Sequence, residues 1–143
     1  MIVVADASTL VGELLRKRGR YLILDDALRV LVTEHQWSET EHELRRRLDI
    51  LVERGAITTE RRAELETDVL SFVKVGAIQI IEASAYEDLE ALARDRVPRD
   101  PNDWPTVALA ISLSVGILTG DNDFLGCGCP TWTVETLTRE LSR

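Results

Sequence analysis

The sequence predicts an α/β fold in which a mostly parallel central sheet is covered by helices on both faces. Short apolar runs rich in β-branched residues alternate along the chain with longer segments of helical periodicity, and no linker interrupts them. Apolar runs bounded by helices are typical of parallel strands that are buried on both faces. With 143 residues, of which 45% are hydrophobic, the chain is long enough to bury a core, so we expect a single domain over residues 1–143.

Four apolar runs have the composition of strands. They cover residues 2–5, 77–81, 115–118 and 131–134. The first run leads directly into a helical segment through Asp6. We expect the last run to lie at an edge of the sheet, because a turn-rich loop over residues 121–130 precedes it.

Periodicity and capping residues predict the helices between these runs. Ser8 is the expected N-cap of the first helix, whose apolar face carries Leu10, Val11, Leu14 and Leu15. The other helices are expected from near Asp25 to Val32, from Trp37 to near Gly55, from Thr58 to Gly76, and over residues 86–93, 107–113 and 135–141.

Composition excludes several classes of protein. The formal net charge of −8 argues against binding of polyanions through a generally basic surface, although local charge can oppose the global sign. No apolar stretch approaches the roughly 20 residues that cross a bilayer, and Met1 is not followed by a basic leader. We therefore expect a cytoplasmic protein without membrane contact. Cys127 and Cys129 have no second pair of ligands to make a zinc motif, and we assign them no role.

Acidic residues recur where a parallel sheet would bring them together. Asp6 ends the first strand, Asp121 and Asp123 follow the third, and Asp103 precedes the apolar segment 107–111. Ligands bind beyond the carboxyl ends of parallel strands, so we expect these side chains at one edge of the sheet. Unit charges about 4 Å apart repel by roughly 1 kcal/mol in water and roughly 4 kcal/mol at a surface-like dielectric. The cluster therefore predicts a divalent cation.

A further acid is expected from the start of the long helix, which contains Glu39, Glu41 and Glu43. On a helix whose apolar stripe runs through Trp37 and Leu44, Glu41 falls on the stripe and the other two glutamates lie off it. Periodicity alone therefore favours Glu41.

Each aspartate also has a purely structural interpretation. Asp6 could cap the first helix, although Ser8 already offers a cap. Asp103 could cap the helix that follows it, and Asp121 and Asp123 could form an Asx-type turn. The sequence leaves these alternatives open.

Three segments resemble the motifs of a known family. Residues 3–10, Val-Val-Ala-Asp-Ala-Ser-Thr-Leu, resemble the opening strand-Asp-x-Ser-x-Leu signature of PIN domains. Residues 118–124, Leu-Thr-Gly-Asp-Asn-Asp-Phe, are similar to the late Thr-x-Asp-x-Asp-Phe motif of that family. Residues 103–110, Asp-Trp-Pro-Thr-Val-Ala-Leu-Ala, are similar to its third motif, an aspartate that leads an Ala-rich helix. The motifs occur in the family's order and span nearly the whole chain.

The resemblance implies a three-layer α/β/α PIN-like domain and a metal-dependent ribonuclease. Asp6, Asp103 and Asp121 match the metal-binding acids, and Asp123 matches the accessory acid in the same turn. We expect Asp6, Asp103 and Asp121 to act in catalysis as well.

The family's second acid follows a Ser or Thr that closes a short extended segment, and counting from Thr33 places this acid at Glu39. This assignment disagrees with the helical stripe. We choose Glu39 as the catalytic acid of this helix, because a metal ligand at the border of a cleft need not lie on the apolar stripe, and Glu41 and Glu43 remain open. Ser8 and Thr119 match hydroxyl positions that would orient the carboxylates. The segment 100–105 is more proline-rich than the simplest form of the third motif, which leaves Asp100 as an auxiliary ligand or as a competitor for the place of Asp103.

A site made only of carboxylates suits hard cations, so we expect Mg²⁺ or Mn²⁺, with one or two ions. The expected reaction is hydrolysis of RNA phosphodiester bonds, and the resemblance implies products with a 5′-phosphate and a 3′-hydroxyl. The alternative is a catalytically silent PIN-like module that binds RNA or protein. A phospho-accepting receiver domain fits poorly, because that fold expects an acidic pair after the first strand and a late lysine.

The chain most resembles the VapC-type toxins of prokaryotic toxin–antitoxin pairs. The resemblance implies a cognate antitoxin, a homodimer and an RNA substrate of the tRNA or rRNA class. Such enzymes select their RNA by its shape and its unstacked bases, and no sequence motif of the protein encodes that choice. RNA that approaches an acidic pocket needs local cations to guide it. The candidates are Arg16, Lys17, Arg18 and Arg20, the run Arg45–Arg47, and Arg94, Arg96 and Arg99.

Overall fold

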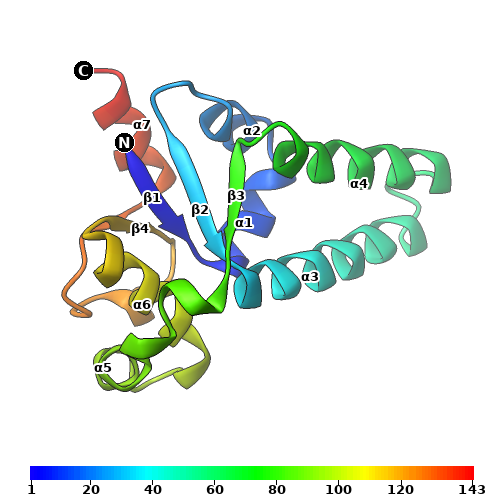
Figure 1. Ribbon diagram of the computed structural model, residues 1–143. Helices are drawn as coiled ribbons and strands as arrows, with labels where there is room; N and C mark the ends of the chain where they lie inside the picture. The colour runs from blue at the N-terminus through cyan, green and yellow to red at the C-terminus, as the bar shows by residue number, and fades with distance from the viewer.

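The computed structural model describes residues 1–143 and has a five-stranded, all-parallel sheet between two layers of helices, a three-layer α/β/α fold (Figure 1). The strands lie in the order β3-β2-β1-β4-β5. Their bounds are Ile2–Ala5 for β1, Arg29–Thr33 for β2, Ile78–Ile81 for β3, Gly116–Leu118 for β4 and Thr131–Trp132 for β5. The chain adds strands on one side of β1 and then on the other, so the winding reverses at β1, where such sheets bind ligands.

The central strand is buried on both faces of the sheet. Val4 pairs with Leu31 of β2 and with Ile117 of β4, and these three side chains belong to one apolar cluster. Their neighbours Val3 and Ala5 belong to the other cluster, on the opposite face. Because successive strand residues point to opposite faces, both faces need apolar side chains, which explains the uninterrupted apolar run.

Seven α-helices form the two outer layers. They are α1 (Ala7–Leu14), α2 (Lys17–Ile23), α3 (Glu34–Glu53), α4 (Thr59–Lys74), α5 (Glu90–Arg96), α6 (Trp104–Leu113) and α7 (Val134–Leu141). Helices α1, α2, α3, α4 and α7 contribute to the cluster around Val3, whereas α5 and α6 contribute to the cluster around Val4. The predicted α/β class with a parallel sheet covered on both faces is confirmed.

The predicted helix from Asp25 to Val32 is wrong. Residues 29–33 form β2, which pairs with both β1 and β3, and its buried residues alternate between the two apolar clusters. Val30 and Val32 are β-branched, and such residues favour a buried strand over a helix, in which their propensity is low.

Helix α2 was not predicted. Its sequence is strongly basic, and only Gly19, Leu22 and Ile23 are buried. Gly19 lies so close to α1 that a Cβ atom there would be 2.2 Å from the carbonyl oxygen of Glu13. The helix therefore depends on a close approach between backbones, which periodicity does not reveal.

Smaller corrections concern the ends of elements. Helix α1 is capped by Asp6 rather than by Ser8, which lies inside the helix. Helix α6 begins at Trp104, and α5 covers residues 90–96 rather than 86–93. Strand β5 ends at Trp132, because Thr133 caps α7 and accepts a hydrogen bond from the backbone of Thr136.

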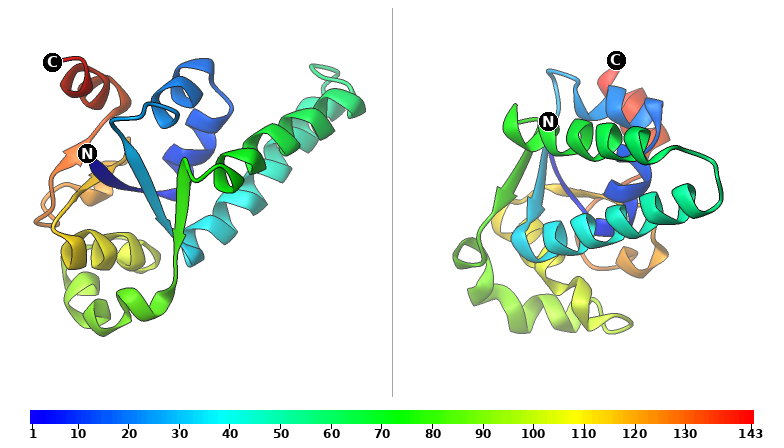
Figure 2. Two further views of the ribbon diagram at one scale, coloured as in Figure 1. Left: turned by 45° about the horizontal axis from the view of Figure 1, so that its top comes forward. Right: turned by 90° about the vertical axis from the view of Figure 1, so that its right-hand side faces the viewer.

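Helices α3 and α4 form a hairpin that extends away from the sheet (Figure 2). Gly55, with a φ of 73°, sits in the turn between them, a conformation that favours glycine. The two helices are joined by ion pairs, in which Arg45 contacts Glu66 at 2.7 Å and Arg62 contacts Asp49 at 2.6 Å. None of the helices has the length and apolarity needed to cross a membrane.

Candidate metal centre

Asp6 occupies the carboxyl end of the central strand and is only 3% exposed. Its Oδ1 atom accepts a hydrogen bond from the backbone N–H of Thr9 at 2.7 Å and one from the hydroxyl of Ser8 at 3.3 Å. Its Oδ2 atom accepts a hydrogen bond from the hydroxyl of Thr119. Asp6 therefore does cap α1, and the predicted orienting hydroxyls, Ser8 and Thr119, do contact it.

Burial raises the pKa of Asp6 above its ordinary value, although hydrogen bonds from Thr119 and Thr9 oppose the shift. The nearby charge of Asp121 adds to the increase. The carboxylate thus lies within the electrostatic reach of the turn after β4, and its charge is held in place by three donors.

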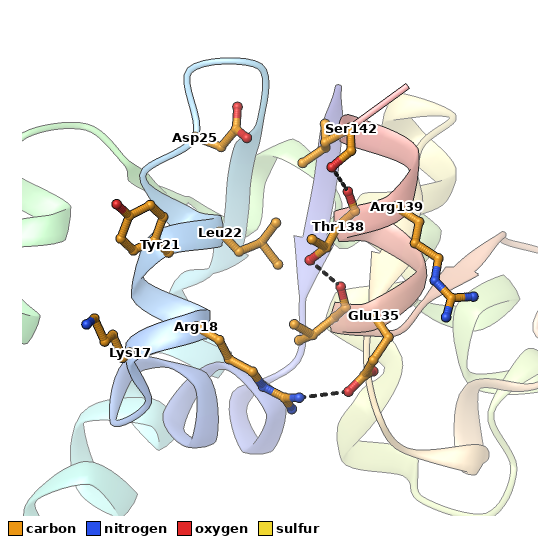
Figure 3. Close-up of a pocket in the computed structure, with 11 residues that line it drawn as sticks. Lys17, Arg18, Tyr21, Leu22, Asp25, Glu135, Thr138, Arg139 and Ser142 are labelled. Carbon is orange, nitrogen blue, oxygen red and sulfur yellow. Dashed lines mark hydrogen bonds and ion pairs between the residues drawn. The ribbon is translucent and has the colours of Figure 1, made fainter.

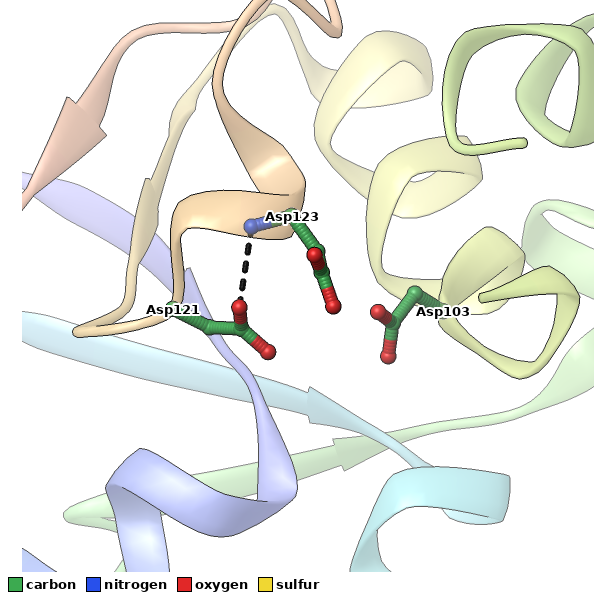
Figure 4. A group of neighbouring side chains, drawn as sticks. All are labelled: Asp103, Asp121 and Asp123. Carbon is green, nitrogen blue, oxygen red and sulfur yellow. Dashed lines mark hydrogen bonds between the residues drawn. The ribbon is translucent and has the colours of Figure 1, made fainter. Parts of the chain in front are cut away.

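Three other carboxylates meet next to Asp6. Asp103, Asp121 and Asp123 each offer an oxygen atom within 4.8 Å of the other two (Figure 4). Asp103 stands immediately before α6, and the two other aspartates come from the turn that follows β4. Such a spacing lets one cation contact all three side chains, and oxygen donors are what hard divalent cations prefer.

The turn after β4 is held by its own hydrogen bonds. The backbone N–H of Asp121 donates to the hydroxyl oxygen of Thr119 at 2.9 Å, and the N–H of Asp123 donates to Oδ1 of Asp121 at 2.9 Å (Figure 4). The Asx-type turn considered from the sequence is therefore present. It aims both carboxylates at Asp103 and does not compete with a metal site.

Asp103 is the least satisfied carboxylate of the cluster. Its Oδ2 atom is buried and has no hydrogen-bond partner, and its side chain does not cap α6. Burial, followed by the charges of Asp100, Asp6, Asp121 and Asp123, raises the pKa of Asp103 to about 7. A buried acceptor without a donor costs about 1–3 kcal/mol, which a bound cation would relieve. The residues present therefore fit a divalent metal.

The predicted fourth acid lies at the border of this cluster. Glu39 lines a depression of about 630 Å³ together with Ala7 and Ser8, next to Asp6, and its carboxylate is 3.5 Å from Nε2 of His35. It is not among the three carboxylates whose oxygen atoms meet.

The two competing glutamates are bound to arginines. Glu41 contacts Arg45 at 3.2 Å, and hydrogen bonds from Arg46 and Arg47 lower the pKa of Glu43 to about 2. Of the three glutamates, Glu39 alone has no arginine partner, which favours it over the other two for a role in the site.

Asp100 and Arg99, from the loop that precedes Asp103, also lie near the cluster. Asp100 accepts a hydrogen bond from the N–H of Asn102 at 3.0 Å, and its oxygen atoms do not belong to the group of three. Arg99 lies 3.9 Å from Oδ1 of Asp123 and is largely exposed. The Asp103 assignment of the third motif thus fits the geometry better than Asp100.

Gln36 was missed by the sequence analysis, although it connects two parts of the site. Its Oε1 atom accepts a hydrogen bond at 2.9 Å from the N–H of Ala7, and its amide nitrogen donates to the carbonyl of Asn102 at 3.3 Å. Ala7 follows Asp6 and Asn102 precedes Asp103, so one buried amide fixes the spacing of both acids. The available signal was a polar residue on the buried stripe of α3, four positions before Thr40.

Comparisons with known proteins agree with this architecture. The chain matches solved structures, among them the crystal structure of PAE2754 from Pyrobaculum aerophilum, with a TM-score of 0.66 and 18% sequence identity over 100% of this chain and 91% of that one. At this identity the likeness shows the fold alone. No curated protein matches the sequence. The sequence profile of the PIN domain matches residues 4–142, and PIN domains are usually nucleases. The chain belongs to the PIN domain family.

Proposed function

We propose that this protein is a metal-dependent endoribonuclease that hydrolyses RNA phosphodiester bonds. The observation that carries the proposal is the meeting of Asp103, Asp121 and Asp123 beside Asp6, at the carboxyl end of the strand where the winding of the sheet reverses. An acid cluster with a buried, unpartnered oxygen atom at this position is costly for folding unless a cation binds there.

Asp103, Asp121 and Asp123 would hold the cation, with Asp6 as a further ligand. The ion would be Mg²⁺ or Mn²⁺, because every donor is a carboxylate and no histidine or thiolate joins them. When bound, such an ion acidifies a water molecule and offsets the charge of a phosphodiester.

The chain's own residues prepare the site for that role. The hydroxyls of Ser8 and Thr119 hold Asp6 in a single orientation, and the amide of Gln36 keeps Asp6 and Asp103 at a fixed separation. Because its pKa is raised to about 7, Asp103 is partly protonated at neutral pH in the metal-free protein, and it would release this proton on cation binding. Glu39, at the border of the cleft, is the proposed fourth acid.

We further propose that the protein is the toxin of a toxin–antitoxin pair that acts as a homodimer on an RNA of the tRNA or rRNA class. The support is the order of the three motifs over residues 3–124, which resembles that of VapC-type toxins. A cognate antitoxin would be its protein partner.

The test is cleavage of total cellular RNA by purified protein with Mg²⁺, Mn²⁺ or EDTA. Asp6→Asn and Asp121→Asn keep the acceptor atoms that cap α1 and the turn after β4, so both variants should fold and lose activity. Glu41→Gln is the matched control, since it removes a carboxylate of α3 that is paired with Arg45.

Discrete cuts that need metal and disappear in both aspartate variants would support the nuclease. Absence of cutting with every metal, by protein shown to be free of antitoxin, would reject it in favour of a silent RNA- or protein-binding module.

A further inference from the structure

Arginines from two parts of the chain meet in a pocket of about 370 Å³ beside the acid cluster. Arg16 and Arg18 come from the start of α2, and Arg47 comes from the middle of α3. Arg47 lies over α1 at Gly12, where an added Cβ atom would be 3.9 Å from its Nη1 atom. The two groups of arginines, which are far apart in the sequence, thus line one concave surface.

The pocket shares a wall with the proposed metal site. Ser8 and Thr9 line it, and both donate a hydrogen bond to Asp6. Ser8 and Arg47 also line the depression that contains Glu39. A continuous surface therefore runs from Glu39 past Ser8 to the arginines. An RNA strand that leaves the acid cluster could follow this surface.

These arginines have donor groups that their protein partners do not use. Arg16 and Arg18 share one oxygen atom of the buried Glu13, at 3.4 and 3.3 Å. Arg18 also contacts Glu135 of α7 at 2.9 Å (Figure 3). Arg47 uses only its Nε atom, which donates to Glu43 at 3.1 Å. Its terminal nitrogen atoms remain available, and Arg16 is 61% exposed at the side chain.

The local charge of the pocket opposes that of the whole protein. Three arginines and two glutamates, Glu13 and Glu135, line it, so it carries a net positive charge in a chain of net charge −8. Guanidinium groups bind phosphate oxygens through paired, charge-assisted hydrogen bonds. We propose that this pocket binds a backbone phosphate of the RNA strand next to the phosphodiester at the acid cluster, an inference that rests on the proposed function.

The test measures binding of a fluorescent single-stranded oligoribonucleotide to the Asp121→Asn protein with Mg²⁺ over a series of salt concentrations. Arg16→Gln and Arg47→Gln should each weaken binding about 5- to 10-fold and reduce the slope of log affinity against log salt by about 0.7. Arg47→Lys keeps the charge and should keep most of the slope.

Arg46→Gln is the matched control, because Arg46 neighbours Arg47, pairs with the same Glu43 and does not line the pocket. An equal loss in Arg46→Gln and Arg47→Gln, or no RNA binding by the parent protein, would overturn the subsite. If otherwise wild-type protein shows no metal-dependent cleavage, the nuclease proposal fails, while the comparison of the arginine variants still decides the pocket.

Discussion

The hydroxyl of Thr119 donates a hydrogen bond to the carboxylate of Asp6, which lies 113 positions away in the chain. The same hydroxyl oxygen accepts the backbone N–H of Asp121. One side chain therefore aligns the acid of β1 with the turn after β4, and it lowers the pKa of Asp6 against the effect of burial.

Thr119→Val should weaken Mn²⁺ binding by about 10- to 100-fold, because the variant keeps the shape of threonine and loses both hydrogen bonds. The pKa of Asp6 should rise further, so the pH at which metal binding begins should move upward. Calorimetric titration with Mn²⁺ at several pH values measures both effects. Thr119→Ser is the control, and an equally large loss in that variant would contradict the role of the hydroxyl.

The metal-free protein should become less stable as the pH rises from about 4 through 7. The folded-state pKa of Asp103, about 7, exceeds the unfolded value near 4, so the folded state binds the proton more tightly and loses that advantage on deprotonation. Burial of Asp6 shifts its pKa in the same direction. Thermal melting in EDTA between pH 4.5 and pH 8 measures the trend.

Mg²⁺ should reverse this trend above pH 7, because a cation then replaces the lost proton. Asp103→Asn should flatten the pH dependence in EDTA and remove much of the stabilisation by metal. A melting temperature that rises with pH in EDTA for the wild-type protein, after comparison with Asp103→Asn, would refute the assignment.

Gln36→Met should lower the rate of RNA cleavage and the affinity for Mn²⁺ more than it lowers stability. Methionine has a similar volume, but the N–H of Ala7 and the carbonyl of Asn102 lose their partner, at about 1–3 kcal/mol of unfolding free energy. Urea unfolding and metal titration measure the two effects separately. The exposed Gln79→Met of β3 is the control, and the idea fails if both variants bind metal equally well.

Gly19→Ala should destabilise the protein by roughly 1–3 kcal/mol, because the added methyl group would meet the backbone of Glu13. Gly12→Ala is the matched change, since its Cβ atom has only an ordinary contact with the flexible end of Arg47. That variant should be neutral or more stable by up to about 1 kcal/mol. Urea unfolding of both variants checks the contrast, and similar free energies would contradict it.

The sequence predicted the architecture because the strongest local signals agreed with it. The run from Ile2 to Ala5 is uniformly apolar, and a parallel strand at the centre of the sheet needs such a run. Strand β2 was misassigned because its aliphatic residues also fit a helical pattern over a short window, and only pairing with β1 and β3 selects the strand.

The candidate site was predicted in part for a similar reason. Asp121 follows a strand and Asp103 precedes a helix, so their positions follow from local sequence. Gln36 has no comparable local signal, since its importance comes from hydrogen bonds to Ala7 and Asn102, two residues that are distant from it along the chain. The convergence of Arg16 and Arg47 is equally non-local and depends on how α1, α2 and α3 pack.

The order of strands also has a consequence for synthesis of the chain. Strand β1, which carries Asp6, leaves the ribosome first, but its neighbour β4 and the turn with Asp121 are among the last segments to be made. Domains generally fold as units, and a strand cannot pair with a neighbour that has not yet been made. A nascent chain would therefore hold no assembled acid cluster. The proposed nuclease could not cleave the RNA of the ribosome that is still making it.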